Sequence, residues 1–222
     1  MTDERLSDME QTQLDKRDHT MASFFDQCYE SGLFRDFDNG EKERACDILD
    51  VLGDIRGWRV IEPGCGCGRF TRLLANRVGE TGCVEACELS PLMIGHCRDA
   101  GFAPHVRFHH ASILDLDLEE GMADAVICFN VWPHFEFQER YLARFRQLLK
   151  PEGMLYIAHS CGRDFINEIH GDAESEEIRG HLLPPAEELK GFLRREGWRP
   201  VADCDETDRY YVLSLIDKHG RE

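Results

Sequence analysis

Apolar residues follow two alternating patterns from residue 41 to the end of the chain. Short apolar runs rich in β-branched residues are typical of strands, and they alternate with longer segments whose apolar positions recur at helical spacing. The strand-like runs read WRVIEP, GCVEACELS, VRFHHASI, ADAVICFNV, MLYIAHS, WRPVADCDE and YYVLSLI. This alternation predicts an α/β fold, in which a doubly wound, mostly parallel sheet is covered by helices on both faces. The last two runs stand close enough to pair as an antiparallel hairpin.

The first 40 residues do not follow this pattern. Residues 1–20 are polar and predict a mobile N-terminal arm. Residues 21–34 interleave aromatic with acidic residues, which is typical of a short helix that covers the pocket of a domain. The folded domain is therefore expected over residues 41–218, with an irregular insertion over residues 160–183 near the expected ligand-binding site.

The chain carries a strong excess of negative charge. Its 43 acidic residues outnumber its 26 basic ones, and the net charge is −17. This field repels polyanions and no block of Lys or Arg offsets it, so a small-molecule substrate is expected and nucleic acid is not. No apolar run approaches the roughly 20 residues that span a bilayer, and the polar start resembles neither a signal peptide nor an anchor. The default expectation is a cytoplasmic protein without a membrane span, with its oligomeric state left open.

Ten cysteines are spread along the chain, mostly inside apolar runs. Because the chain shows no secretion signal and no Cys-x-x-Cys pair, we expect most of them to be reduced and buried. A metal or thiol sensor that uses these cysteines stays the alternative.

The stretch VIEPGCGCG joins the first strand-like run to a helix, at the edge where parallel sheets bind ligands. Gly64, Gly66 and Gly68 form a G-x-G-x-G loop, whose backbone can approach a ligand closely and aim N–H groups at it. Glu62 precedes the loop and Glu88 closes the next strand. The first carboxylate favours a cationic ligand that bears an ammonium and a sulfonium, and the second can accept both hydroxyls of a ribose.

A dinucleotide-binding loop is the competing interpretation. It requires glycines in the order G-x-G-x-x-G, and Arg69 occupies the third of these positions. Glu62 would also stand where a pyrophosphate approaches, which is electrostatically unfavourable. Both features argue against a nicotinamide-dependent oxidoreductase.

Five motifs in order make the chain similar to class I (Rossmann-like) S-adenosylmethionine-dependent methyltransferases, over roughly residues 41–218. The motifs read VIEPGCGCGRFT, VEACELSPLMIGHCR, VRFHHASILDL, ADAVICFNVWPHF and FRQLLKPEGMLYIAH. The resemblance implies a transferase that carries out methylation with S-adenosylmethionine as its cofactor. It also implies a seven-stranded sheet whose last strand is inserted antiparallel, in agreement with the hairpin expected above.

The resemblance further implies a set of cofactor-binding residues around the first three strands. The methionine end, the ribose, the adenine and the methyl group would be contacted by Glu62, Gly64, Cys65, Gly66, Gly68, Glu88, Leu89, Ser112, Ile113 and Asn130. Ser112 stands where the family has an acid that contacts the adenine. This departure weakens the contact to the amino group of the adenine, which the Ser112 hydroxyl or the Ile113 backbone can still serve.

Residues that follow the fourth and fifth strands face the methyl group in this fold. His134 and His159 are therefore the candidate catalytic residues, as a base or as groups that orient the acceptor. The simpler alternative is that both side chains only hydrogen-bond neighbouring backbone. The segment DFINEIH predicts one or two helical turns, and the candidate acceptor-pocket residues are Trp132, Arg163, Asn167 and His170. A metal bound by the histidines stays an open alternative.

These observations predict an enzyme that moves a methyl group to a small-molecule N, O, S or metalloid acceptor. The alternative is a cofactor-binding or metal/thiol-sensing regulatory protein without turnover. No motif in the chain identifies the acceptor.

Overall fold

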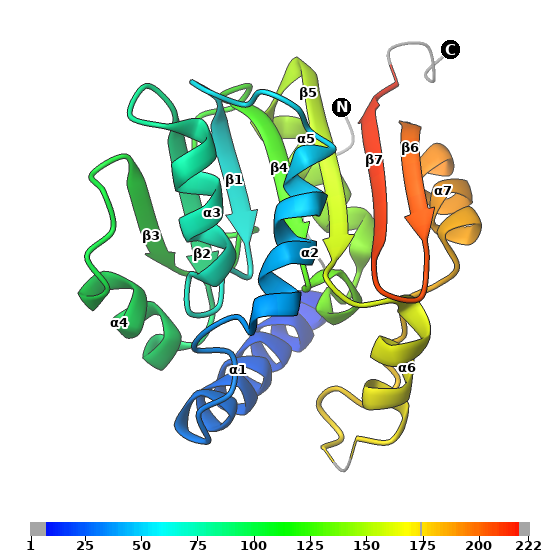
Figure 1. Ribbon diagram of the computed structural model, residues 1–222. Coiled ribbons are helices and arrows are strands. Elements are labelled where there is room, and N and C mark those ends of the chain that lie inside the picture. The colour runs from blue at the N-terminus through cyan, green and yellow to red at the C-terminus, as the bar shows by residue number, and fades with distance from the viewer. Residues whose placement is uncertain (1–7, 174, 218–222) are drawn as a thin grey trace.

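A seven-stranded sheet forms the centre of the protein in the computed structural model, which describes residues 8–173 and 175–217 (Figure 1). The strand order is β3-β2-β1-β4-β5-β7-β6. The strands are β1 (Arg59–Pro63), β2 (Cys83–Glu88), β3 (Val106–His110), β4 (Ala123–Phe129), β5 (Leu149–His159), β6 (Trp198–Asp205) and β7 (Tyr210–Ile216). Among the strands of the described residues, β7 runs opposite in direction to the other six, and it pairs antiparallel with β5 and with β6. The predicted fold class and the antiparallel hairpin at the end of the described chain are therefore confirmed.

Helices cover both faces of the sheet (Figure 1). They are α1 (Asp8–Glu30), α2 (Asn39–Asp50), α3 (Arg69–Val78), α4 (Pro91–Asp99), the 3₁₀ turn η1 (Trp132–His134), α5 (Gln138–Leu148), α6 (Arg163–Gly171) and α7 (Ala186–Arg195). The apolar stripes of α2 and α3 pack on one face, and those of α5 and α7 pack on the other. The central strand β4 is buried on both faces, which its continuous apolar sequence predicted. Among the described residues, no helix has the length and apolar character needed to cross a membrane.

Two of the helices next to the site begin at capping side chains. The Asp38 carboxylate accepts the Glu41 N–H at 2.7 Å and starts α2. The Ser90 hydroxyl accepts the Met93 N–H at 3.1 Å and starts α4, where Pro91 takes the first helical position. Both caps lie near the carboxyl edge of the sheet, so they fix the loops that border the site.

The N-terminal segment differs from the prediction. The expected arm over residues 1–20 and the short helix over residues 21–34 are replaced by one helix, α1, which starts at Asp8, while residues 1–7 lie outside the described residues. Leu14 and Met21 are each 3% exposed, so this mostly polar helix is held by a narrow apolar stripe. The division of the chain at residue 40 stays a prediction.

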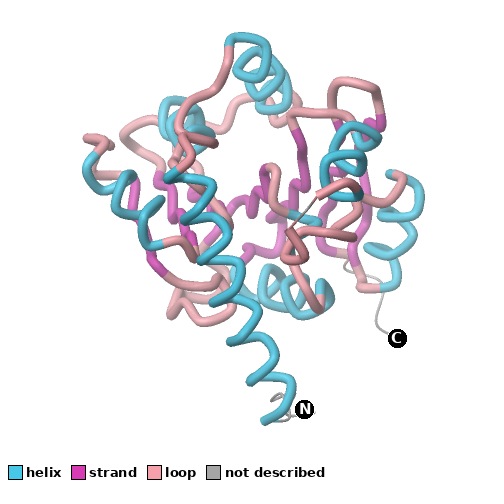
Figure 2. Tube along the Cα trace, turned by 90° about the horizontal axis from the view of Figure 1, so that it is seen from below, coloured by secondary structure: helices cyan, strands magenta, loops and turns pink. Residues whose placement is uncertain are grey.

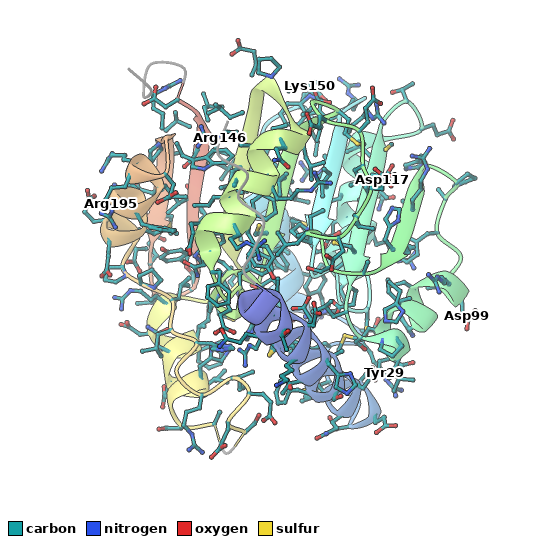
Figure 3. All side chains as sticks on the ribbon, turned by 180° about the vertical axis from the view of Figure 1, so that it is seen from behind. Tyr29, Asp99, Asp117, Arg146, Lys150 and Arg195 are labelled. Carbon is teal, nitrogen blue, oxygen red and sulfur yellow. The ribbon has the colours of Figure 1, made fainter. Side chains whose placement is uncertain are left out.

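Helix α1 runs along the edge of the sheet where the parallel strands end (Figure 1). Figure 2 looks onto this edge from below and shows α1 crossing it. Near the end of the helix, Tyr29, which Figure 3 labels, packs against His96 of α4 with ring centroids 5.8 Å apart. The edge that carries the candidate ligand-binding residues is therefore covered by a helix.

Candidate active site

The loop after β1 is shaped by three glycines in the left-handed backbone region. The φ angles of Gly64, Gly66 and Gly68 are 71°, 54° and 76°. A Cβ on Gly64 would lie 2.4 Å from Cγ2 of Val131, and one on Gly68 would lie 2.8 Å from Cζ of Phe102. Space and backbone conformation therefore both require glycine at these two positions, whereas at Gly66 the backbone conformation alone sets the requirement.

The acid at the end of β2 holds this loop. Glu88 is 7% exposed, and its Oε2 accepts the Gly66 N–H at 2.9 Å. Its Oε1 accepts the N–H groups of Leu89 at 2.8 Å and Ser90 at 2.9 Å. Burial raises the pKa of Glu88, and these three backbone hydrogen bonds oppose that rise. A carboxylate offers about four lone-pair positions, so Glu88 keeps acceptor capacity for a ligand hydroxyl.

Glu62 lies buried at the end of β1, beside the glycine loop. Its side chain is 2% exposed, and its Oε2 has no hydrogen-bond partner among the described residues. Burial, with a further contribution from the charge of Glu88, raises the pKa of Glu62 to about 8. An isolated buried carboxylate is costly unless a cation or a hydrogen-bond donor meets it. Glu62 is therefore suited to a cationic ligand.

Asn130 joins the ends of β4 and β5. Its φ is 54°, and its side-chain amide donates to the Ser160 hydroxyl at 3.0 Å while its Oδ1 accepts the Ser160 N–H at 2.9 Å. The Ser160 carbonyl accepts from Arg44 of α2 at 2.6 Å, and Glu41 of the same helix pairs with Arg69 at 2.9 Å. Sequence reasoning predicted Asn130 but missed this polar network, because its members come from four separate segments.

The cysteines near the loop behave as small buried groups. The Cys97 thiol donates to the Gly66 carbonyl at 3.3 Å, and the Cys65 thiol reaches the same oxygen at 3.8 Å. Burial is the main reason that the pKa of Cys67 rises to about 12. All ten cysteines are free thiols. Over residues 8–173 and 175–217, no group of three or more His, Cys, Asp or Glu side chains has the arrangement of a metal site.

Three histidines meet on the acceptor side of the predicted site. The Nδ1 atoms of His134 and His181 lie 3.0 Å apart, and the rings of His134 and His170 have centroids 5.0 Å apart. His170 Nδ1 donates to the carbonyl oxygen of His181 at 2.6 Å. Sequence reasoning missed His181, which no motif marks. The chain folds back after α6 and brings His181 next to His134 and His170.

His159 ends β5 and is 2% exposed, and its Nε2 has no hydrogen-bond partner among the described residues. Burial lowers the pKa of His159 to about 3 and that of His181 to about 4. Burial also lowers the pKa of His134 well below its usual range, and the neighbouring histidines add to this effect. The rings of His134, His159 and His181 are therefore neutral at pH 7 and are weak bases.

The four predicted acceptor-pocket residues do not share one environment. Asn167 on α6 holds the returning chain, because its amide donates to the Leu183 carbonyl at 3.0 Å and accepts the Leu183 N–H at 2.7 Å. Arg163, at the start of the same helix, pairs with Asp205 of β6 at 3.2 Å. Trp132 is fully buried in the apolar core. Only His170 meets the other histidines. The helical turns predicted for DFINEIH are present as α6.

Part of the chain is similar to known proteins. A family model described as a methyltransferase domain matches residues 61–157. Residues 61–157 thus match a methyltransferase domain, and the seven-stranded sheet has the strand order of the class I S-adenosylmethionine-dependent methyltransferase fold.

Solved structures share this methyltransferase fold. An S-adenosylmethionine-dependent methyltransferase from Aquifex aeolicus has a TM-score of 0.64 at 17% identity, over 78% of this chain and 89% of that one. Geranyl diphosphate C-methyltransferase from Streptomyces coelicolor A3(2) has a TM-score of 0.61 at 17% identity, over 80% of each chain. At this identity the likeness concerns the fold alone.

Curated methyltransferases match part of the chain. The tRNA (adenine(58)-N(1))-methyltransferase TrmI of Thermus thermophilus is 34% identical over 139 residues, which are 61% of this chain and 52% of that protein. The ubiquinone biosynthesis O-methyltransferase of Xanthomonas oryzae pv. oryzae is 32% identical over 115 residues, which are 50% of this chain and 47% of that protein. The chain spans about half the length of these relatives. Because one of them is named for tRNA, the comparisons do not support the expectation that excludes nucleic acid.

The residues around the glycine loop fit the cofactor of the family. S-adenosylmethionine carries an ammonium and a sulfonium, and the Oε2 of Glu62 is a buried carboxylate oxygen without a partner among the described residues. Gly64, Gly66 and Gly68 carry no side chain, so none of their own atoms screens the backbone N–H groups of this loop from a ligand. Glu88 keeps the acceptor capacity that a ribose hydroxyl needs.

Proposed function

We propose that this protein transfers a methyl group from S-adenosylmethionine to a small-molecule acceptor at an N, O, S or metalloid atom. The observation that carries the proposal is the pair of buried acids on either side of the glycine loop. Glu62 is 2% exposed and Glu88 is 7% exposed. Burial of two carboxyl groups costs free energy. A ligand that brings a positive charge to one acid and hydroxyl groups to the other would offset this cost.

Each part of the cofactor has a matching group on the chain. Glu62 and the Gly64 backbone would hold the methionine end, and Glu88 would hold the ribose. The remaining predicted contacts, to the adenine, the loop and the methyl group, come from Cys65, Gly66, Gly68, Leu89, Ser112, Ile113 and Asn130. The bound cofactor supplies an electrophilic methyl group on a good leaving group. The chain then has to align the acceptor and keep water out.

The acceptor side favours orientation over proton removal. His134, His159 and His181 have lowered pKa values, so each is a neutral hydrogen-bonding group and a weak base at pH 7. The role proposed for His134 and His159 is therefore to hold an acceptor whose nucleophilic atom already carries a free lone pair. Asn167 and His170 support this side by fixing the chain that carries His181.

A small acceptor is supported by the cover over the site and by the charge of the chain. The ring of Phe25 on α1 packs against His134 with centroids 5.5 Å apart, so α1 encloses the acceptor side. The net charge of −17 disfavours a polyanion.

Calorimetric titration with the demethylated cofactor, S-adenosylhomocysteine, tests the cofactor part of this proposal. We expect a 1:1 isotherm for the wild type and binding weakened about tenfold or more for Glu62→Gln, because a charge-assisted contact is lost. Glu80→Gln, an exposed acid in a distant loop, is the matched control and should bind as the wild type does. No binding by the wild type would overturn the proposal.

A turnover assay tests the acceptor part. The protein would be incubated with S-adenosylmethionine labelled on its methyl group and with phenols, amines, thiols, arsenite or unmodified tRNA. Label transfer to one of the small molecules supports the proposal. Transfer to tRNA alone contradicts the small-molecule acceptor, and binding without transfer to any compound favours the regulatory alternative.

A further inference from the structure

A cavity of about 300 Å³ lies between α1 and the chain that follows β2 and β3. Helix α1 contributes Asp18, Ala22 and Asp26 to its wall, and the opposite wall contains Leu89, Pro91 and His110. The backbone N–H of Leu89 donates at 2.8 Å to Glu88, the acid proposed to bind the ribose, so one residue of the cavity wall is bonded to that carboxylate. No predicted site residue other than Leu89 lines this cavity.

Contacts on both sides of the cavity hold α1 in place. Asp26 accepts a hydrogen bond from the Ser90 hydroxyl and the N–H of Leu92 at 3.2 Å, both at the start of α4. Nearer the start of α1, the guanidinium of Arg17 contacts the ring of His181 and lies 3.7 Å from a carboxylate oxygen of Glu136. Asp18 lies between these two attachments, so its position over the cavity is defined.

The negative charge of the Asp18 carboxylate is only partly offset by the groups around it. Partial burial and the nearby charge of Asp115 raise the pKa of Asp18 to about 6, although the Ser112 hydroxyl opposes the rise. Asp15 adds a further acidic charge, and Arg17 offsets only part of the total. A ligand that donates a hydrogen bond would relieve this arrangement.

The walls of the cavity match the chemistry of an adenine ring. The flat faces of adenine are apolar, and its exocyclic amino group presents two N–H donors. Leu89 and Pro91 offer aliphatic surface on one side of the cavity, and the Asp18 carboxylate offers an acceptor on the other. An apolar wall combined with a few placed polar groups, Asp18 among them, is what orients a ring in a small-molecule site.

We propose that Asp18 binds the cofactor, by accepting a hydrogen bond from the exocyclic amino group of the adenine. The inference rests on the proposed function, because it requires S-adenosylmethionine in this site. Helix α1 is then part of the binding site. Asp18 supplies the carboxylate that is absent at Ser112. Discrimination between adenine and a base with oxygen at the same ring position then depends on Asp18, because a carboxylate cannot donate to that oxygen.

The test compares two ligands and three forms of the full chain by calorimetry. The ligands are S-adenosylhomocysteine and S-inosylhomocysteine, in which oxygen replaces the amino group. The wild type should prefer the adenosyl ligand by about tenfold or more. Asp18→Asn, which can donate as well as accept, should bind the adenosyl ligand about tenfold more weakly and should lose most of that preference.

The matched control is Asp15→Asn, an exposed position one turn earlier on the same helix. It removes the same charge and should keep the wild-type preference. An unchanged preference in Asp18→Asn, with the wild-type melting temperature retained, would overturn the inference. If Glu62→Gln still weakens binding in that case, the proposed function stands without it. Failure of the wild type to bind either ligand overturns both.

Discussion

The carboxylate of Glu88 accepts the backbone N–H of Gly66 at 2.9 Å. The acid that ends β2 thus fixes the middle of the glycine loop that follows β1. A single side chain thereby has two tasks: it shapes the loop before a ligand arrives, and it keeps acceptor capacity for the ligand. Substitutions at Glu88 are expected to disturb both tasks.

Glu88→Gln should lower both stability and affinity. The amide of Gln keeps one oxygen acceptor, and its NH₂ group would face an N–H donor on one side. Loss of a hydrogen bond to a charged group costs about 1.5–3 kcal/mol. We therefore expect the free energy of unfolding, measured by urea denaturation, to fall by about 2 kcal/mol. Glu80→Gln should unfold like the wild type, and a Glu88→Gln protein of full stability would show that the loop does not depend on this carboxylate.

Binding of the cofactor should release a proton from Glu62. Without ligand its pKa is raised to about 8, so the carboxyl is mostly protonated at pH 7. An ammonium placed against it favours the charged form and lowers the pKa. Titration with S-adenosylhomocysteine at pH 7 in phosphate and in Tris should differ in heat by the buffer ionisation of about one proton. Glu62→Gln should abolish this difference, and equal heats for the wild type in both buffers would argue against the placement of the ammonium.

Gly64→Ala should destabilise the protein through a contact with one side chain. The new Cβ would lie 2.4 Å from Cγ2 of Val131, and the φ of 71° disfavours any side chain. Overpacking of this kind costs about 1–3 kcal/mol, and the left-handed conformation adds about 1–2 kcal/mol. In thermal or urea unfolding, the second substitution Val131→Ala should restore the overpacking part only. A double variant no more stable than Gly64→Ala would contradict the contact.

Acid should destabilise the protein in part through His159. Burial lowers its pKa to about 3 in the folded state, from an ordinary value of 6.5. Between these two values the unfolded chain binds a proton at this site and the folded protein does not, so stability is lost as the pH falls below about 6.5. The contribution of one such group is at most about 1.4 kcal/mol per pH unit.

The difference between the wild type and His159→Phe isolates this contribution. The free energy of unfolding of the variant should fall less steeply between pH 6.5 and pH 4.5 than that of the wild type. Equal slopes for the two proteins would show that His159 does not stay neutral in the folded state. Glu62 titrates in both proteins, and its contribution cancels in the comparison.

Short-range information in the chain was sufficient to predict the sheet and the glycine loop with the two acids beside it. Val60 and Ile61 lie in one apolar run, and Glu62 and Gly64 follow within four positions, so strand, turn and acid are neighbours in the sequence as well as in space. Local backbone preferences and strand burial act at this range. The predicted fold class was correct for the same reason.

The N-terminal segment and the acceptor side were decided by tertiary contacts. The polar residues before Met21 predicted a mobile arm, because helix propensity alone rarely stabilises such a segment in water. In the folded protein, Asp26 is bonded to the start of α4 and Arg17 contacts His181, and these contacts order α1 over the site. His181 reaches His134 across 47 positions of chain. The sequence by itself determined the strands, the glycine loop and the two acids, because these depend on adjacent residues. The cavity at Asp18 and the group of histidines depended on the tertiary structure, because packing brings together side chains that no local pattern relates.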